Sequence, residues 1–593
     1  MKILGITDHI ISGAAILEDG KVLAAVNEER LVRKKMVMGF PRKSIAEVFR
    51  LANVRPDEMD QVAVASQWGT FLNKYVDFDG GLFEVDRGLI KNVFFSVGSR
   101  LSHYRLKVPI LESLYYNLRK PVYAQRRISI RRVLKEEFGI ECPVKFISHH
   151  FSHACSAYYS SGFNDGLVVT MDGSGDGNSS HVYSVTNGKW QILHKVAGFD
   201  SLGSYYGYVT HICGFKAGKH EGKITGLAAY GKDSYKDILY QFIQYNNGTI
   251  TNIGNAFFTA AVQKLLGALP KDFKREDLSA TIQNVAEEVA TQYIQYWREK
   301  TGKHDVALAG GLFANVKINQ RIHELPGVRS VFIHPGMSDE GLAVGAALAL
   351  NYINSSDPSK INTRCMDHVY LGPEFSQDRI KEALEKAGVS YSFHQEVEPE
   401  IARLISKGFV VARVNGRMEY GPRALGNRSI LYKPDDHSVN DWLNKNLKRT
   451  EFMPFAPSTL AEDADKFYHN LDGARETARF MTITFQCTEE MKNQCPGVVH
   501  VDGTARPQLV SQTDNPSYYR IIQNFKELTG KSSVVNTSFN IHEEPIVCTP
   551  EDAIRAFKIG HLDVLAIGSF TVMNPSAEKR VQLREAERKT LAN

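Results

Sequence analysis

An apolar strand that runs into a turn of glycine and aspartate gives the first indication of the class of this chain: Gly166-Leu167-Val168-Val169-Thr170-Met171, then Asp172-Gly173-Ser174-Gly175-Asp176-Gly177. The apolar run predicts a buried strand, and the glycines allow backbone N–H groups to approach a ligand closely. Two further segments repeat the pattern, Asp305–Ala309 before Gly310-Gly311 and Ser330–His334 before Pro335–Gly341. In all three cases we expect the strand to end in its turn and a helix to follow.

The N-terminal segment predicts a strand and hairpin unit. Strands are expected at Lys2–Ile6, Gly13–Leu17 and Val22–Asn27, with a hairpin turn at Glu18–Lys21. Helices at 43–53 and 55–60 and a strand at Gln61–Ser66 follow. Such a unit ahead of glycine-rich turns is typical of the actin/Hsp70/sugar-kinase type of ATPase domain, in which the nucleotide lies between two phosphate-binding loops. The candidate nucleotide-binding residues are Asp172, Gly173, Gly310, Gly311 and Asn315.

The length of the chain requires more than one domain. Its 593 residues exceed what one hydrophobic core serves. We expect a first α/β domain at 1–355, a polar linker at Asn354–Thr363, a second α/β domain at 365–575 and a charged tail at 576–593. Residues 70–140 are rich in aromatic and basic side chains and predict a helical insertion in the first domain.

Composition restricts the class of protein. Hydrophobic residues make up 43% and charged residues 23%, which is ordinary for a globular protein. The net charge of +5 is mild for this size and gives no argument for a nucleic-acid partner. There is no apolar run of about 18 residues, so we expect no membrane span. Seven scattered cysteines without a C-x-x-C pair fit a reduced, cytoplasmic protein. The sequence leaves open whether the protein forms a homodimer.

A histidine pair predicts a metal site. His149 and His153 are four residues apart, so on a helix both imidazoles face the same side and can bind one ion. Asp339, at a strand-to-helix turn, would complete two histidines and one carboxylate around a metal with open positions. The alternatives are a surface or capping histidine cluster, and a helix N-cap for Asp339. Iron is the first candidate for the divalent metal, with zinc or manganese as alternatives.

The chain resembles the NodU/CmcH family of O-carbamoyltransferases along nearly its whole length. The motifs that carry the resemblance are His149–Tyr159; Glu28-Glu29-Arg30 with Arg33-Lys34-Lys35; Gly222-Lys223-x-x-Gly226-Leu227-Ala228-Ala229-Tyr230-Gly231; Gly416-Arg417-x-Glu419-x-Gly421-Pro422-Arg423-Ala424-Leu425-Gly426-x-Arg428-Ser429; Pro454-Phe455-Ala456-Pro457; and Asn536-Thr537-Ser538-Phe539-Asn540. The long arginine motif is the most specific of them.

The resemblance implies an N-terminal ATPase-like domain similar to the tRNA threonylcarbamoyl transferases. It implies a C-terminal domain similar to the enzymes that make threonylcarbamoyl-adenylate. The implied substrates are ATP with Mg²⁺, carbamoyl phosphate, and a hydroxyl-bearing small molecule or saccharide as acceptor. The implied reaction forms carbamoyl-adenylate, releases pyrophosphate and passes the carbamoyl group to the acceptor hydroxyl.

The resemblance also assigns residues. It implies that Arg423, Lys448, Arg506 and Ser538 bind carbamoyl phosphate, and Arg417 and Arg449 are further candidates in the same basic region. Arginine suits this task because its guanidinium binds phosphate through two parallel hydrogen bonds. Arg423 and Lys448 are also catalytic candidates, and Lys223 would hold the nucleotide. The alternative is that Arg417 and Arg428 pair with Glu419 or Asp441 and brace the domain.

The catalytic base is where the sequence departs from the family. Members carry a His-Asp pair where this chain has Ile10-Ile11. Asp8 and His9 lie just before, but on an extended strand His9 would point away from the side of Ile10 unless the turn is reshaped. The alternatives are that Asp8 acts as the base, or that the metal lowers the pKa of the acceptor hydroxyl. Met453 replaces an arginine of the family, and Glu543 replaces a glycine.

Other functions compete with carbamoyl transfer to a small acceptor. A tRNA threonylcarbamoyl transferase would use the basic 100–135 region, and a hydrogenase-maturation carbamoyltransferase would carry zinc-finger cysteines, which are missing here. A nucleotide sensor without transfer activity is the third alternative. Residues 70–140 and Ser201–Phe215, with their tyrosines, are candidates for shaping the acceptor pocket; the alternative is that those tyrosines pack in the core.

Overall fold

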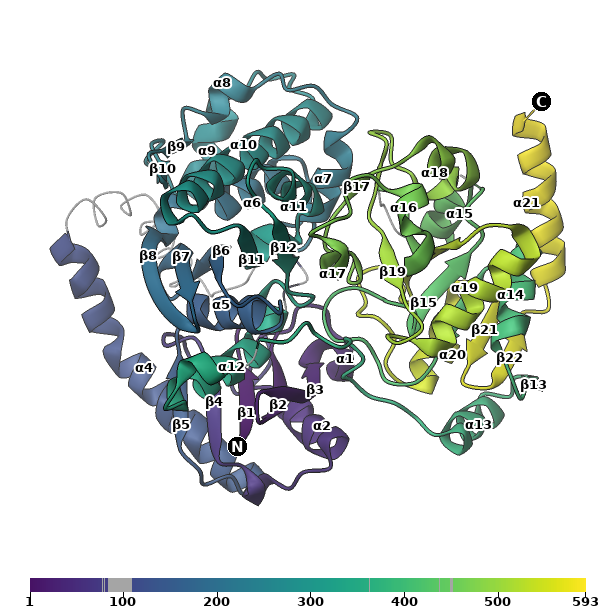
Figure 1. The fold of residues 1–593 in the computed structure, drawn as a ribbon, viewed down its shortest axis with the longest axis horizontal. Helices are drawn as coiled ribbons and strands as arrows, with labels where there is room; N and C mark the ends of the chain where they lie inside the picture. The colour runs from purple at the N-terminus through teal and green to yellow at the C-terminus, as the bar shows by residue number, and fades with distance from the viewer. Residues whose placement is uncertain are drawn as a thin grey trace. The chain divides into compact units, whose positions relative to one another are not determined.

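The computed structural model divides into two compact units (Figure 1). Unit 1 holds Met1–Glu29 and Met36–Met366, and unit 2 holds Arg30–Lys35 and Asp367–Asn593. The structure describes residues 1–76, 78, 80–83, 109–361, 363–436, 438–447 and 452–592. Within these residues, no helix is both long and apolar enough to cross a lipid bilayer.

The first sheet of unit 1 grows from the N-terminal hairpin. Its strand order is β3-β2-β1-β4-β5. β1 pairs antiparallel with β2 and β2 with β3, whereas β4 and β5 run parallel to β1. The strands are β1 (Lys2–Thr7), β2 (Gly13–Glu18), β3 (Lys21–Asn27), β4 (Gln61–Ala65) and β5 (Val144–Ile147). The predicted strands and hairpin are confirmed; α2 (Arg42–Ala52) matches the first predicted helix, but the second is only the 3-10 turn η1 (Pro56–Glu58).

The second sheet of unit 1 repeats the first. Its order is β12-β11-β6-β7-β8, again with two antiparallel neighbours on one side of the central strand and two parallel strands on the other. The strands are β6 (Gly166–Gly175), β7 (Asn178–Thr186), β8 (Lys189–Ala197), β11 (Asp305–Ala309) and β12 (Ser330–Ile333). Helix α12 (Leu342–Asn354) packs on the first sheet, α5 (His149–Tyr159) on the second, and the two helices pack on each other. This duplicated arrangement is the actin/Hsp70/sugar-kinase type predicted from the sequence.

One of the three predicted strand-to-helix turns is wrong. β6 does not enter a helix; it turns back into β7 through Asp176 and Gly177, whose φ angles are 47° and 82°. Positive φ at both central residues is the geometry of a tight hairpin turn, for which Asp-Gly is a preferred pair. The other two are confirmed. β11 leads through η3 (Gly311–Ala314) into α11 (Val316–His323), and β12 leads through η4 (Asp339–Gly341) into α12.

The predicted insertion is helical at Pro109–Phe138, whereas its described residues between 70 and 83 form turns and one isolated β-bridge at Val76. Helix α4 (Pro109–Phe138) lies between β4 and β5 in the chain, and residues 84–108 lie outside the described part. The tyrosines at 205, 206 and 208 are buried, so they pack in the core as the alternative proposed. The remaining elements of unit 1 are η2 (Gly198–Asp200), α6 (Leu202–Ile212), α7 (Glu221–Ala228), α8 (Lys236–Leu239), β9 (Ile243–Asn246), β10 (Thr249–Asn252), α9 (Thr259–Ala268), α10 (Arg275–Thr301) and η5 (Pro358–Lys360).

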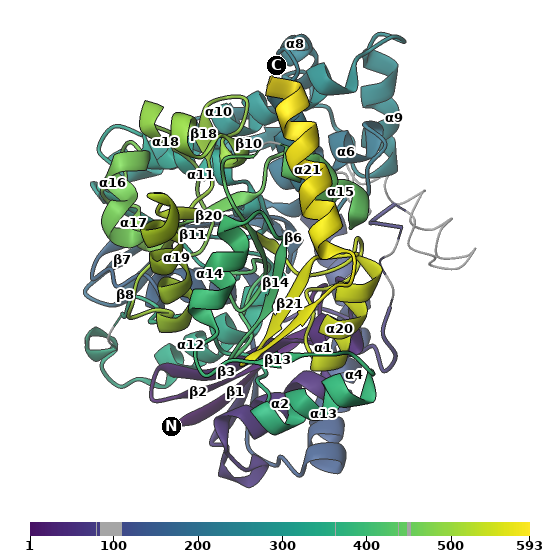
Figure 2. The ribbon, with the colours of Figure 1, turned by 90° about the vertical axis from the view of Figure 1, so that its right-hand side faces the viewer.

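Unit 2 is built on one mixed sheet of eight strands (Figure 2), and its predicted α/β class is confirmed. The strands, in spatial order, are β13 (Ser392–Phe393), β22 (Phe570–Met573), β21 (Val564–Ile567), β14 (Val411–Val414), β15 (Arg428–Tyr432), β20 (Ser533–Ser538), β16 (Ala456–Leu460) and β19 (Gln508–Val510). Helices α14 (Glu398–Ser406) and α19 (Pro516–Thr529) pack together and bury a core of aliphatic and aromatic side chains with the sheet. α13 (Gln377–Lys386) packs on α20 (Pro550–Ile559), which contacts β14 and β21.

The shorter elements of unit 2 surround this sheet. They are α15 (Ser438–Asn446), η6 (Ala461–Asp463), α16 (Ala464–Phe467), α17 (Arg475–Ala478), β17 (Phe485–Gln486), α18 (Glu489–Gln494), η7 (Pro496–Val498) and β18 (Thr504–Ala505). Helix α1 (Glu28–Val32) spans the point where the chain passes between the two units.

The charged C-terminal segment is a helix, α21 (Ala577–Ala592), and its first half is fastened to unit 2. Val581 joins the core, and Arg584 ion-pairs with Asp563 while donating to the Gly408 carbonyl at 3.1 Å. Asp563 is fully buried and also accepts from Arg580 Nε at 3.0 Å and from the Val410 N–H at 2.9 Å. One carboxylate therefore ties α21 to β14 and β21.

Asp563→Ala should lower the free energy of unfolding by about 3–5 kcal/mol, because it leaves the buried Arg584 without its counter-charge. The measurement is the shift of the urea transition of the full chain. Asp472→Ala is the matched control, since Asp472 is 98% exposed and its pair with Arg475 is a surface pair worth at most about 1 kcal/mol. Equal shifts for the two variants would contradict this account.

Candidate functional site

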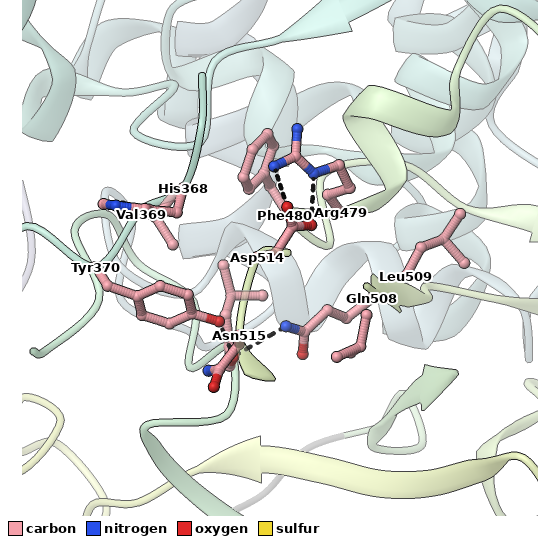
Figure 3. A pocket seen from close by; sticks show the side chains of 11 residues that line it. His368, Val369, Tyr370, Arg479, Phe480, Gln508, Leu509, Asp514 and Asn515 are labelled. Carbon is pink, nitrogen blue, oxygen red and sulfur yellow. Dashed lines mark hydrogen bonds and ion pairs between the residues drawn. The ribbon is translucent and has the colours of Figure 1, made fainter. Parts of the chain in front are cut away.

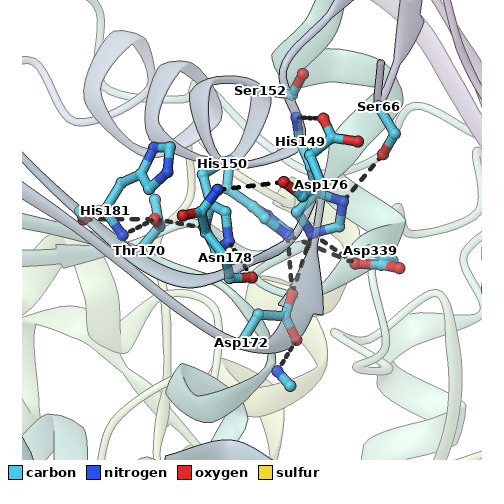
Figure 4. Close-up of polar contacts among 12 residues, drawn as sticks. Ser66, His149, His150, Ser152, Thr170, Asp172, Asp176, Asn178, His181 and Asp339 are labelled. Carbon is cyan, nitrogen blue, oxygen red and sulfur yellow. Dashed lines mark hydrogen bonds and ion pairs between the residues drawn. The ribbon is translucent and has the colours of Figure 1, made fainter. Parts of the chain in front are cut away.

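Four side chains of unit 1 converge on one point (Figure 4). α5 supplies His149 and His153 one helical turn apart, β6 supplies Asp172, and Asp339 begins the turn before α12. The Nε2 atoms of His149 and His153 lie 3.4 and 3.2 Å from Oδ2 of Asp172. They lie 3.6 and 3.5 Å from Oδ1 of Asp339.

The spacing of these donors fits a small divalent cation. A first-row metal binds such atoms at about 2.0–2.2 Å, so neighbouring ligand atoms around it lie about 3.0–3.5 Å apart. The four donor atoms all lie within 4.8 Å of one another, and the closest nitrogen–oxygen pairs have the required spacing. Two imidazoles and two carboxylates suit iron, zinc or manganese, so the donor set does not select among them.

The electrostatics of the group also favour a cation. Burial lowers the pKa of His153, but the hydrogen bonds and charges of Asp172 and Asp339 outweigh burial and raise that pKa to about 9. Burial raises the pKa of Asp172, and the two histidines outweigh it and hold the pKa well below its usual value. The lowered pKa of Asp172 and the raised pKa of His153 both indicate that positive charge is stabilised at the centre of this group.

Asp172 lies in a different group of side chains from the one predicted for it. The sequence placed it with the nucleotide loop, whereas the structure brings it into the predicted metal group as a fourth side chain. A signal for this was present in the sequence. Asp172 follows the apolar residues of β6, Asp339 lies in the turn between β12 and α12, and parallel strands of one sheet end at the same edge. Asp176 and Gly175 also lie against His149, and neither was predicted from the sequence as a site residue.

Gly175 makes room for the ring of His149, a candidate metal ligand. A Cβ atom at position 175 would lie 2.0–2.4 Å from three atoms of the His149 ring. No side chain fits at that distance, so any larger residue displaces the imidazole.

Gly175→Ala should weaken metal binding at least about tenfold, because the His149 ring must move away from Asp172 and Asp339. The measurement is Co²⁺ affinity by competition with a chelator. Gly267→Ala in α9 is the control, since a Cβ there meets nothing within 4 Å. If Gly175→Ala binds Co²⁺ as tightly as that control, the assignment of His149 as a ligand is wrong.

The predicted glycine loops lie against this group. Gly310 has a φ of 110° and donates its N–H to the Met337 carbonyl at 2.6 Å. A Cβ at Gly311 would lie 2.9 Å from Oδ1 of Asp172, whereas one at Gly173 meets nothing within 4 Å. The Gly173 N–H donates to the same Asp172 oxygen at 2.7 Å. Two of the loops expected to hold phosphates thus lie beside the metal group.

Two other nucleotide candidates are placed differently. Asn315 caps the N-terminus of α11, where its side-chain oxygen accepts from the N–H groups of Lys317 and Ile318 and its amide donates to Gln283 at 2.8 Å. Its side chain is therefore used by the fold. Lys223 is buried on α7, with its ammonium 5.9 Å from the centroid of the Phe215 ring.

The segment that carries the candidate base is a turn, not an extended strand. Residues 8–12 connect β1 to β2, and Ile11 has a φ of 61°, a strained value for a β-branched residue. The turn sets the His9 ring 6.2 Å from the His149 ring, centroid to centroid. Burial lowers the pKa of His9, so its imidazole is neutral near pH 7 and able to accept a proton.

Asp8 is engaged elsewhere. Its two oxygens accept from Nη2 and Nε of Arg126, at 2.5 and 3.0 Å, and both side chains are buried. Burial raises the pKa of Asp8, but the Arg126 guanidinium outweighs it and holds the pKa below its usual value. A carboxylate held in this way is a weak base, which leaves His9 as the better candidate.

In unit 2, two arginines of the long motif brace the backbone. Arg428 is buried and donates to four carbonyls, those of Asn415, Asn427, Pro373 and Gly416. Arg417 donates to the carbonyls of Leu371 and Gly372. Arg417 and Arg428 therefore brace the domain, as the alternative proposed, and they do so through hydrogen bonds to backbone carbonyls. The Glu419 carboxylate accepts from the N–H groups of Leu425, Asn427 and Arg428.

Three predicted carbamoyl-phosphate ligands sit on segments that are joined to one another. Asn536 donates to the Ala424 carbonyl at 3.2 Å and to Oε1 of Gln508 at 3.0 Å. Arg423 is next to Ala424. Ser538 lies two residues from Asn536 in β20, the spacing that places side chains on one face of a strand. Arg506 lies between β18 and β19, two residues before Gln508. Lys448 and Arg449 lie outside the described residues.

The loop that carries Arg423 lines a small pocket of unit 2 through Leu425 (Figure 3). The Leu425 carbonyl accepts from the Tyr370 hydroxyl at 2.8 Å and from Nε2 of Gln508 at 2.9 Å. Arg479, on the pocket wall, pairs through two hydrogen bonds with Asp514. The pocket is lined by His368, Val369, Tyr370, Leu425, Arg479, Phe480, Gln508, Leu509, Val510, Asp514 and Asn515.

Arg30 and Arg33, from the motif near the N-terminus, belong to unit 2. Arg30 donates to the carbonyl of Gly421 at 2.8 Å, and Arg33 donates to the carbonyls of Pro545 and Ile546 at 2.9 and 2.7 Å. Glu543 has a φ of 63°, which explains why the family carries glycine there. The structure offers no account of Met453.

Two family models match the chain in order. The model described as "Carbamoyltransferase N-terminus" matches residues 2–348, and the model described as "Carbamoyltransferase C-terminus" matches residues 402–574. Together they include both groups of candidate residues described above.

Curated proteins are similar over long stretches. Nodulation protein NolNO of Sinorhizobium fredii is 33% identical over 95% of this chain and 79% of its own length. The 3'-hydroxymethylcephem-O-carbamoyltransferase of Streptomyces clavuligerus is 29% identical over 44% of this chain and 47% of its own. Among solved structures, component A of the (R)-2-hydroxyglutaryl-CoA dehydratase of Acidaminococcus fermentans is 18% identical, with a TM-score of 0.32 over 59% of this chain and 96% of that one.

Proposed function

Because the chain belongs to the carbamoyltransferase family of NodU/CmcH type, and so is a transferase, we propose that it is an ATP-dependent O-carbamoyltransferase. The observation that carries this proposal is the match of both family models, in order, on a chain whose first unit holds the four-residue metal group. The proposed substrates are carbamoyl phosphate, ATP with Mg²⁺ and a hydroxyl group of a small molecule or saccharide.

The proposed reaction has three balanced steps. Water takes the phosphoryl group of carbamoyl phosphate, which leaves carbamate and inorganic phosphate. A carbamate oxygen attacks the α-phosphorus of ATP, and pyrophosphate leaves carbamoyl-adenylate behind. The acceptor hydroxyl then attacks the carbamoyl carbon, AMP leaves, and the hydroxyl proton passes to a base.

We assign the base to His9. Its imidazole is neutral at pH 7 because burial lowers its pKa, and it lies beside the metal group. Asp8, with both oxygens bound by Arg126, would hold the turn that presents His9. A metal held by His149, His153, Asp172 and Asp339 would act as a Lewis acid toward phosphate or carbamoyl oxygens.

Charge neutralisation is the second requirement, because both carbamoyl phosphate and ATP are polyanions. We propose that Arg423 and Arg506 bind the phosphate of carbamoyl phosphate and that Ser538 donates its hydroxyl. Phosphoryl transfer depends mostly on such positioning and charge stabilisation. Arg417 and Arg428 would act indirectly, by fixing the loop around Arg423. We propose a reducing, cytoplasmic location, because none of the seven cysteines forms a disulfide bond in the structure.

Pyrophosphate release from ATP should depend on added carbamoyl phosphate when the full chain is assayed with Mg²⁺ and with Fe²⁺, Mn²⁺ or Zn²⁺. Arg423→Lys should lower kcat/KM for carbamoyl phosphate about 10–100-fold, because lysine cannot make the paired hydrogen bonds. The control is Arg55→Lys, whose side chain is 74% exposed in a surface pair. If pyrophosphate release does not depend on carbamoyl phosphate with any of these metals, the enzyme proposal fails and the alternative of a nucleotide sensor is favoured.

A further inference from the structure

Ser66 links a buried ion pair to one of the candidate metal ligands. It follows β4 directly, is fully buried, and has a φ of 67°, which is unusual for a residue other than glycine. Its hydroxyl oxygen lies 3.1 Å from Nδ1 of His149 (Figure 4). The strained backbone thus coincides with a contact to the site.

This contact defines which nitrogen of His149 faces the metal group. An imidazole that binds a cation through Nε2 needs its proton on Nδ1, and a hydrogen-bond acceptor at Nδ1 selects that tautomer. The Ser66 hydroxyl oxygen is in position to accept this proton, while Nε2 points to Asp172 and Asp339. The same bond fixes the rotation of the ring.

Arg126 of α4 holds Ser66 in place. It is 1% exposed and donates to the Ser66 carbonyl at 2.9 Å, to the Ala65 carbonyl at 3.1 Å, and to both oxygens of Asp8. Burying an ion pair is costly, and apolar side chains of similar volume often stabilise a fold equally well. The fork of the guanidinium does something apolar side chains cannot: it fixes two consecutive carbonyls and the turn before His9.

Asp176 fixes the same loop from the other side. Its carboxylate accepts from the N–H groups of Gln67 at 2.9 Å and Trp68 at 3.0 Å, and from the N–H of His149 itself at 2.8 Å. The loop after β4 and the start of α5 therefore share one anchor. With Arg126 on one side and Asp176 on the other, Ser66 has little freedom to leave Nδ1 of His149.

We propose that Ser66 and Arg126 are positioning residues for His149, and that through them helix α4 of the insertion sets the affinity of the metal site. Neither residue is one of the four candidate ligands. The inference rests on the metal site of the proposed function, but not on which group that site helps to transfer.

The test is the Co²⁺ affinity of the full chain, measured by chelator competition, together with the visible spectrum of the bound Co²⁺. Ser66→Ala and Ser66→Gly both remove the hydroxyl, but glycine accepts a φ of 67° without strain. Both should raise the Kd about 10–100-fold, the usual effect of losing a partner of a metal-bound histidine, and both should change the spectrum. Arg126→Lys keeps a charge beside Asp8 but loses the fork, and should raise the Kd at least about tenfold.

The controls lie on the same helix. Ser129→Ala removes a buried hydroxyl of α4, and Arg131→Lys changes an exposed arginine of α4. Both variants should bind Co²⁺ as the unaltered chain does. If Ser66→Ala binds normally, or if Ser66→Gly binds normally while Ser66→Ala does not, the hydroxyl has no positioning role and the inference is overturned. If Arg126→Lys fails to fold, the two Ser66 variants decide.

The outcomes also separate this inference from the proposed function. An unaltered chain that binds Co²⁺ but releases no pyrophosphate with carbamoyl phosphate overturns the function and leaves the positioning role standing. An unaltered chain that binds no Co²⁺ overturns the metal site and, with it, the inference.

Discussion

The close approach of α12 to α5 and β1 is the constraint on which unit 1 depends. A Cβ at Gly345 would lie 1.9 Å from the Ser152 carbonyl oxygen on α5, and one at Gly5 would lie 2.0 Å from the Ala343 carbonyl oxygen on α12. Only glycine fits at both points. This contact joins the two sheets of unit 1 through their helices, and it brings the start of α12, where Asp339 lies, to the histidines of α5. The metal group is a consequence of that packing.

Apolar patterning and glycine turns were sufficient to predict seven strands of the duplicated fold, but not β5, β7 or β8. The spacing of four residues predicted the histidine pair. They failed at Asp176-Gly177, because the glycine-rich turn was read as a phosphate loop when its last two residues also suit a hairpin. Asp172 was assigned to the nucleotide for the same reason. The anchoring of the site through Ser66, Arg126 and Asp176 could not be predicted, since these contacts join segments that are 27–118 residues apart in sequence.

The arginine motif illustrates a limit of reading function from residue type. Arg417 and Arg428 are the right kind of residue for phosphate, yet both donate hydrogen bonds to backbone carbonyls of the segment 371–373. The loop of Arg423 is joined through Ala424 and Leu425 to β20, which carries Ser538, and to β19, which begins two residues after Arg506. A sequence shows that arginines are present, but only the fold shows that two of them hold backbone carbonyls.

The central claim is that His149, His153, Asp172 and Asp339 form one cation site. Anomalous diffraction from crystals grown with Co²⁺, recorded on both sides of the cobalt absorption edge, tests it most directly. The account predicts one strong anomalous peak about 2.0–2.2 Å from the Nε2 atoms of both histidines and from carboxylate oxygens of the two aspartates. A strong peak elsewhere with none at this position, in protein that binds Co²⁺ stoichiometrically in solution, would contradict it.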